Sequence, residues 1–370
     1  MVAGRALVCL ALLVHAAPAL AVSDAPLGVG TPGTFRSLFL EMPLVDARGA
    51  GAKGSVDVRW WLANDWSVPT RLTRGNEVLW VQQDEQADVL QLSLTLPWSR
   101  FGQQSWLGRV QTTAELRLIE HWGGWTDLPI ERWHTLIGSW NFQREFYPRN
   151  EVNLTLSEEG GATLADLHHP QLALSDVVLR TLFRLGQGPP RPDGELPWAA
   201  ALRLDLKLPT GQLALLGGSG GFDAGVGVVG VLAPLTWFTL HGQLAARLVS
   251  GLPRGFPLQP EGAQWGLDLS AVLRLGGEVA LVLEDRVSSP LFRGGWALAA
   301  GEKEPEATAY YSMFQAYNQI SGGIRIGEIT VFFCEDFTPG KRLPTDPGPR
   351  WFYNSNSPDV VLGVAFTRPL

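Results

Sequence analysis

Stretches in which every second residue is apolar recur along most of this chain, and they constrain its fold more than any other feature. In residues 202–208 every even position is leucine and every odd position is charged. The same alternation runs through residues 88–96, 107–120 and 263–274. Because successive side chains of a strand point to opposite faces, this pattern predicts strands with one apolar and one polar face. We therefore expect an all-β protein.

Short turn sequences separate these stretches, so the strands can pair as antiparallel neighbours. The predicted strands are residues 34–41, 55–63, 76–82, 88–96, 107–119, 174–186, 197–208, 223–232, 236–248, 263–274, 277–287, 319–326, 328–336 and 359–368. Because the ends of predicted elements are set only to within a few residues, the pattern gives about 12–14 strands.

Two observations favour an antiparallel transmembrane β-barrel over a soluble β-sandwich, which alternation alone also allows. Many predicted strands run about 9–13 residues, the length that a tilted membrane strand needs, whereas strands of soluble proteins average about 5–6 residues. Tryptophans gather near the predicted strand ends, as in the aromatic girdles of outer-membrane barrels. They are Trp66, Trp98, Trp106, Trp122, Trp125, Trp198, Trp237 and Trp351. In such a barrel the leucines face lipid and the charges face the lumen.

The first 21 residues have the pattern of a secretory signal peptide. Arg5 precedes an apolar run, and a small-x-small site ends at Ala21. This predicts cleavage between Ala21 and Val22, with Ala17 as the second choice. Residues 22–370 are then expected to form a single barrel domain.

Composition and charge limit the partners of the exported chain. The net charge of −7 argues against a nucleic-acid-binding protein, which would present a basic face. After cleavage Cys334 is the only cysteine, so no intramolecular disulfide is expected. The expected partners are outer-membrane lipid, the barrel-assembly machinery and small hydrophilic solutes, and no cofactor is expected.

Residues 224–246 contain no Asp, Glu, Lys or Arg and are long enough for a membrane helix. Gly225, Gly227, Gly230 and Pro234 make this stretch a poor helix former. Pro234 also falls where a hairpin would turn. We therefore predict two strands joined near Pro234.

Residues 120–172 interrupt the strand pattern and form a predicted insertion between barrel strands. Within it, residues 126–140 carry apolar side chains at helical spacing, with Thr126 or Asp127 as the cap. The residues that follow predict a small hairpin that turns at residues 160–161. The short amphipathic helix suits either the lumen or the membrane interface, which makes the insertion a candidate plug or gate.

Blocks at residues 34–44, 124–150, 333–337 and 357–370 resemble, in order and spacing, a bacterial outer-membrane β-barrel family known as domain-of-unknown-function 3187. The most specific block is the Trp-His core of the predicted helix followed by Tyr-Pro-Arg-Asn at residues 147–150. The resemblance spans nearly the whole exported chain. It implies a barrel in the outer membrane of a Gram-negative bacterium. Because the family has no established activity, it implies no catalytic residue.

The sequence offers few patterns for catalysis or metal binding. His168 and His169 are adjacent, so in a strand they would point to opposite faces. His134 has no serine on the same helical face. His241 lies on the polar face of its strand and, with Ser270, would form the centre of a barrel-embedded hydrolase, the least favoured function. No catalytic, cofactor-binding or metal site is therefore assigned.

The polar faces of the strands are the candidate functional site, because in a barrel they line the lumen. The lumen-facing candidates are Asp57, Arg59, Arg109, Glu115, Arg117, Arg180, Arg184, Arg203, Asp205, Lys207, His241, Arg247, Asp268, Arg274, Glu284 and Arg286. Their two signs interleave, so they either line a water-filled pore or pair across a narrow lumen, and pairing with a small or occluded passage is favoured. We expect a passive channel or transporter for small hydrophilic solutes rather than an enzyme. A structural or docking barrel with an occluded lumen is the alternative.

Overall fold

The computed structural model describes residues 23–370 apart from 31–32, 34, 51–53, 103, 138–143, 162, 193, 254–255, 257, 300–312, 315 and 337–359. The predicted signal peptide, its cleavage site and Trp351 lie outside these residues.

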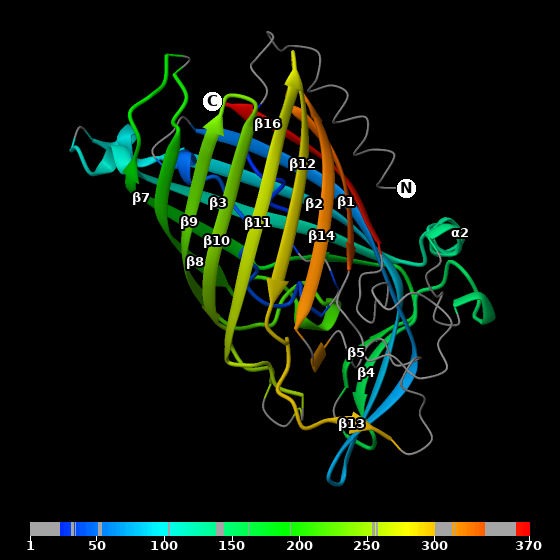
Figure 1. Ribbon diagram of the computed structural model, residues 1–370. Helices are drawn as coiled ribbons and strands as arrows, with labels where there is room; N and C mark the ends of the chain where they lie inside the picture. The colour runs from blue at the N-terminus through cyan, green and yellow to red at the C-terminus, as the bar shows by residue number, and fades with distance from the viewer. Residues whose placement is uncertain are drawn as a thin grey trace.

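Twelve antiparallel strands form a closed barrel (Figure 1). Around the wall they are β1 (Ser55–Arg74), β2 (Glu77–Pro97), β3 (Val110–Trp122), β7 (Val177–Gln187), β8 (Trp198–Leu208), β9 (Asp223–Leu235), β10 (Phe238–Leu248), β11 (Ala263–Gly276), β12 (Val279–Ser288), β14 (Tyr317–Ile326), β15 (Ile329–Asp336) and β16 (Val360–Pro369). Because β1 pairs with both β2 and β16, the wall has no free edge. The prediction of an all-β barrel with about 12–14 strands is confirmed.

The wall alternates between an apolar outer face and a polar inner face. On β8, Leu204 and Leu206 are exposed on the outside, whereas Arg203, Asp205 and Lys207 are buried on the inside. Such alternation is typical of barrels whose outer face contacts lipid. No helix within the described ranges is long and apolar enough to cross a membrane.

The two ends of the barrel differ in the length of their connections. At one end, which we call the short-turn end, residues 236–237, 277–278 and 327–328 link neighbouring strands, and the C-terminal Leu370 lies beside Gly54. Two longer connections, residues 98–109 and 188–197, also lie at this end. The other long connections gather at the opposite, long-loop end (Figure 1). In outer-membrane barrels the short turns face the periplasm and the long loops face the outside.

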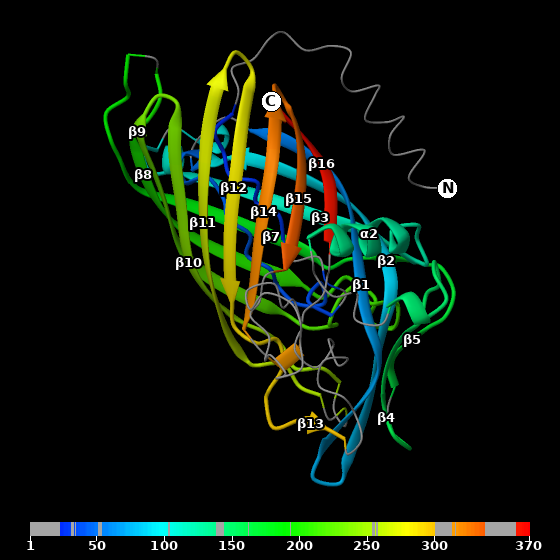
Figure 2. The ribbon, with the colours of Figure 1, turned by 45° about the vertical axis from the view of Figure 1, so that its right-hand side comes forward.

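Several small elements lie inside or around the wall. They are α2 (Asp127–Ile137), β4 (Leu154–Glu158), β5 (Thr163–Leu167), β6 (Gln171–Leu174), β13 (Ala297–Leu298), η2 (Ala47–Gly49), η3 (Trp98–Phe101), η4 (Leu107–Arg109), η5 (Arg144–Phe146) and η6 (Leu213–Leu215). The β1–β2 hairpin continues beyond the barrel at the long-loop end, where β13 and β4 pair with it (Figure 2).

Several predicted strands differ from the structure. The strand predicted at 55–63 continues to Arg74 in β1. The predicted strands at 76–82 and 88–96 are one continuous strand, β2. The predicted strand at 34–41 is wrong, because residues 35–38 form a turn instead. Phe35, Leu38, Phe39 and Leu40 are all buried, so the segment has neither the solvent face nor the lipid face of a barrel strand. Residues 224–246, by contrast, form β9 and β10 as predicted.

Candidate functional site: a filled lumen

The structure places nearly all the predicted lumen residues on the inner face of the wall, by strand position and burial. Those that are buried there are Asp57, Glu115, Arg117, Arg180, Arg203, Asp205, Lys207, His241, Asp268, Glu284 and Arg286. Arg59, Arg184, Arg247 and Arg274 occupy inward positions and are half-buried. Arg109 is the exception: it lies exposed in η4, because β3 begins only at Val110.

The buried charges form ion pairs that run from strand to strand. Glu115 on β3 contacts Arg117 at 2.8 Å and Arg180 of β7 at 3.3 Å. Arg180 also contacts Asp205 of β8 at 3.1 Å, and Asp205 contacts Arg203 at 2.6 Å. The interleaved signs therefore pair along the wall, which lowers the cost of burying them.

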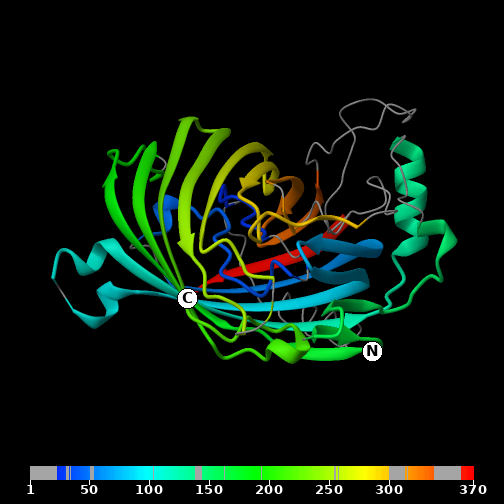
Figure 3. The ribbon, with the colours of Figure 1, turned by 90° about the horizontal axis from the view of Figure 1, so that it is seen from below.

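The described residues between 23 and 50, which we call the lumen segment, lie inside the barrel (Figure 3). Its first limb, residues 23–30, begins at the short-turn end, where Ser23 contacts Arg325 near the β14–β15 turn. An apex at residues 35–39 reaches the long-loop end, and a second limb, residues 40–50, returns to the short-turn end before β1 begins. The sequence analysis missed this segment.

Wall side chains hold both limbs chiefly through main-chain oxygens. Arg59 donates to the carbonyl oxygens of Leu27 and Gly28, each at 2.7 Å. Arg325 donates to those of Ser23 and Ala25, at 2.7 and 2.8 Å.

The second limb is held in the same way. Gln243 donates to Met42 O at 2.7 Å, and Arg203 and Arg247 donate to the carbonyl oxygens of Pro43 and Leu40. Recognition through the main chain leaves little trace in the sequence of the segment itself.

Glycines on the inner face make room for the segment. A Cβ atom at Gly225 of β9 would lie 2.3 Å from Met42 Sδ, and one at Gly323 of β14 would lie 2.7 Å from Leu27 Cδ2. Glycine inside a strand often marks a close approach of another part of the chain. These inward glycines are the one sequence signal that could have indicated an occupied lumen.

A cluster of charges ties the two limbs together at the short-turn end. Arg48 contacts Asp24 at 2.5 Å and Asp46 at 2.6 Å. Asp24 also accepts a hydrogen bond from Thr239 of β10 at 2.8 Å and contacts Arg274 of β11 at 3.2 Å. We call this cluster the base clamp.

The base clamp sets the charge of Asp24. Burial alone would raise the pKa of Asp24, but the hydrogen bonds and positive charge of Arg48, with Thr239 and Arg274, hold it at about 2. Asp24 is therefore ionised throughout the neutral and mildly acidic range, and the clamp is intact there.

At the long-loop end the apex is packed in an apolar cluster. Phe35, Leu38 and Phe39 are buried there against the extended β1–β2 hairpin and neighbouring loops. The ring of Phe39 lies edge-on to Phe292, with centroids 6.0 Å apart. Burying a large apolar side chain contributes about 1.5–3 kcal/mol, so this cluster stabilises the filled state.

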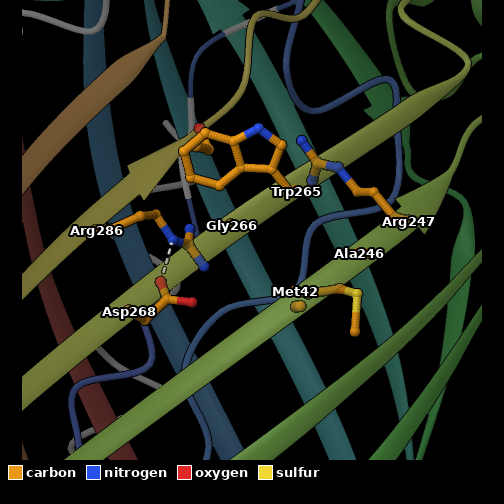
Figure 4. A pocket seen from close by; sticks show the side chains of 9 residues that line it. Met42, Ala246, Arg247, Trp265, Gly266, Asp268 and Arg286 are labelled. Carbon is orange, nitrogen blue, oxygen red and sulfur yellow. Dashed lines mark hydrogen bonds and ion pairs between the residues drawn. The ribbon is translucent and has the colours of Figure 1, made fainter.

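Space remains between the lumen segment and one side of the wall. A cavity of about 350 Å³ lies beside β1, β2 and β3, and its lining includes Arg59, Gln91, Gln111 and Thr113. It extends to Glu328 in the β14–β15 turn at the short-turn end. A second pocket, of about 30 Å³, lies where Met42 approaches β10 and β11 beside the Arg286–Asp268 pair (Figure 4).

The helix of the 120–172 insertion lies outside the wall (Figures 2 and 3). Trp133 of α2 stacks edge-on against Phe333 of β15, with centroids 5.7 Å apart, and Leu136 is exposed. Residues 154–158 and 163–167 form the predicted hairpin as β4 and β5. The role of the insertion as a plug or gate stays a prediction, whereas the lumen itself is filled by residues 23–50.

The geometry required for a hydrolase is not met among the described residues. His241 and Ser270 are cross-strand neighbours on β10 and β11. However, His241 Nε2 lies 2.7 Å from the main-chain oxygen of Asp24 rather than from a carboxylate. In the described part of the chain neither His241 Nδ1 nor Ser270 Oγ has a hydrogen-bond partner, and no group of acidic, histidine or cysteine side chains is arranged to hold a metal.

A closed antiparallel wall, an apolar outer face and a polar, charge-paired interior define an outer-membrane β-barrel of the porin-like class. Within this class the present barrel is one whose lumen holds a segment of its own chain.

Known structures include barrels of similar outline. An outer membrane channel from Pseudomonas putida F1 is 10% identical, covers 86% of this chain and 96% of its own, and has a TM-score of 0.45. The transport unit of the autotransporter AIDA-I from Escherichia coli is 9% identical over 88% of this chain and 92% of its own, with a TM-score of 0.36. A Pseudomonas aeruginosa FadL homologue is 7% identical over 85% and 88%, with a TM-score of 0.32.

At these sequence identities, none of the three similarities indicates a solute for the present barrel. No family model matches the sequence, and no curated protein is significantly similar to it. The resemblance to domain-of-unknown-function 3187 therefore stays a prediction.

Proposed function

We propose that the protein is a channel for small hydrophilic solutes in the outer membrane of a Gram-negative bacterium, and that the lumen segment holds it closed. The observation that carries this proposal is the way the segment is bound. Polar and charged wall side chains hold its limbs by hydrogen bonds to main-chain atoms. If the segment leaves, the same side chains line a polar passage, which suits hydrophilic solutes.

The path of the segment also supports reversible opening. Both limbs end at the short-turn end, so the segment can withdraw from one mouth without threading through the barrel. A hydrogen bond from a charged arginine contributes only about 1.5–3 kcal/mol and one from a neutral side chain about 0.5–1.5 kcal/mol, and water entering the lumen would replace each of them. The apolar cluster at the apex adds further stability to the closed state.

The test is planar-bilayer conductance of the full chain carrying a protease site inserted at residues 51–53, between the lumen segment and β1. The protein is folded first, the site is cut, and loss of residues 23–50 is followed by mass spectrometry. We expect silence before cleavage and stepwise currents after the segment has been released. A folded, segment-free barrel that shows no current would contradict the proposed channel function. The alternative, a structural or docking barrel, would then be favoured.

An engineered disulfide that fixes the lumen segment to the wall is the control for channel opening in the uncut protein. Met42→Cys with Gly225→Cys, in a Cys334→Ser background, places two thiols where Met42 Sδ approaches β9. The oxidised protein should show no openings, and reduction should restore those of the unlocked chain. Deletion of residues 126–140 tests the insertion separately. If the insertion is a gate, this deletion should change the frequency of openings even while the lumen segment is in place.

A further inference from the structure

The arginines that hold the lumen segment fall into two groups. Arg59 and Arg203 each contact a carboxylate of the wall, Asp57 and Asp205, at 2.6 Å. They keep this partner whether or not the segment is present.

Arg247 and Arg325 have no carboxylate partner within the described part of the chain. Arg247 donates to Gln264 Oε1 at 2.8 Å and to the carbonyl oxygen of Leu40. Arg325 donates to Thr330 Oγ1 at 3.0 Å and, with its terminal nitrogens, to the carbonyl oxygens of Ser23, Ala25 and Pro26. Oxygens of the segment thus occupy the places where a guanidinium fork usually binds an oxyanion.

The charged wall residues around Arg247 and Arg325 do not neutralise the positive charges of these two arginines. The wall charges that act on Arg247 are Arg286 and Asp223, which already contact Asp268 and Lys207 respectively. Those that act on Arg325 are Arg59 and Asp57, which contact each other. The other acidic groups near them, Asp24, Glu41 and Asp46, belong to the lumen segment and leave with it.

We propose that Arg247 and Arg325 form two oxyanion-binding positions in the open channel, and that its solutes are small carboxylates or phosphates. This inference rests on the proposed channel function. Arg325 lies toward the short-turn end and Arg247 toward the long-loop end, so a solute meets one cation near each mouth (Figure 4 shows Arg247). Two separated cations favour selective yet transient binding, because ions must be able to leave as well as enter.

The experiment measures the reversal potential of the cleaved, segment-free protein in a KCl gradient, and then the block of its current by inorganic phosphate. We expect a Cl⁻/K⁺ permeability ratio above one and a phosphate block that saturates. Arg247→Gln and Arg325→Gln should each lower the ratio, and the double variant should bring it to one or below. Arg109→Gln removes an equally positive but solvent-exposed side chain of η4 and should change neither value.

Variants that preserve the positive charge separate its electrostatic effect on permeability from the binding of an oxyanion. Arg247→Lys and Arg325→Lys should keep the permeability ratio but weaken the phosphate block, because an ammonium lacks the planar fork. Full-length Gly225→Leu protein, in which the added side chain displaces the second limb, provides a second open form if a cleaved variant fails to fold. A conducting channel that prefers K⁺, or whose selectivity ignores both Gln variants, would overturn this inference alone. Absence of current from every folded, segment-free form would overturn the channel itself.

Discussion

At the scale of single residues, the lumen shows how charge can be structural inside a membrane protein. Arg203 is fully buried and donates to both oxygens of Asp205, to Gln243 and to the main chain of the lumen segment. A buried ion with this many acceptors cannot be removed without leaving several polar groups unpaired.

Arg203→Ala should therefore destabilise the folded barrel by about 3–5 kcal/mol, the usual cost of breaking a buried pair. Among the described residues, Asp205 would then keep Arg180 as its one cationic partner. Urea unfolding in detergent, followed by tryptophan fluorescence, measures the change. Arg109→Ala is the matched control, since this exposed arginine should alter stability by no more than about 0.5 kcal/mol. Equal stability of both variants would refute the structural role.

The base clamp gives the closed state a defined dependence on pH. The pKa of Asp24 is about 2 in the closed structure, against 3.8 for the ordinary side chain. A lowered pKa stabilises the state that lowers it at every pH above the ordinary value. The contribution, on the order of 2 kcal/mol, is lost as pH falls from about 4 toward 2.

Channel openings should accordingly be unchanged between pH 7 and 5 and become more frequent below about pH 3. Asp24→Asn should open at neutral pH and show no further rise on acidification. Single-channel recordings across this range provide the measurement. Openings that increase between pH 7 and 5 would point to a different titrating group.

At the scale of elements, β9 is the strand most closely shaped to the lumen segment. Its inward Gly225 faces Met42, whereas at the outward Gly230 no atom lies within 4 Å of the place that a Cβ atom would take. The two glycines thus share a strand and differ in what they face.

Gly225→Leu should push the second limb out of place and raise the frequency of openings, because the added side chain occupies the space of Met42. Gly230→Leu should leave the openings unchanged, since its side chain points to lipid. Bilayer recordings of both proteins, after a gel-shift check of folding, test the pair. If the two variants behave alike, steric fit at β9 does not control opening.

Features that depend on neighbouring residues could be predicted from the sequence, whereas features that depend on contacts between distant residues could not. Strands such as β8 and β11 follow from their own alternation, and so do the inward charges they carry. The lumen segment could not be predicted in this way, because Leu40 and Met42 contact partners about 200 positions away. The predicted strand at residues 34–41 failed for the same reason, because Phe35, Leu38 and Phe39 are buried against distant parts of the chain.

At the scale of the whole molecule, closure of the wall governs behaviour in solution. Every strand of the barrel has two neighbours, so the hydrogen-bonded ring has no point at which unfolding can begin easily. The apolar outer face requires lipid or detergent around it.

The folded protein should therefore resist sodium dodecyl sulfate until heated and run as two bands, compact without heating and extended after boiling. It should leave bacterial envelopes only with detergent. Gel electrophoresis of heated and unheated samples, together with fractionation, checks both expectations. A folded form in the soluble periplasmic fraction would contradict the membrane assignment.

The base clamp lies next to Ser23, at the N-terminal start of the lumen segment, and this position has a mechanical consequence. A pull on the chain before Ser23, directed out of the short-turn end, loads the clamp and Arg325 first and the contacts of Leu27 only afterwards. The bonds then break one after another, as in peeling, rather than all together, as in shear. A pull applied from β1 would load Arg48 of the second limb first, and therefore the same base clamp. The clamp therefore acts as a latch, because release of the segment from either limb begins with the contacts of Asp24 and Arg48.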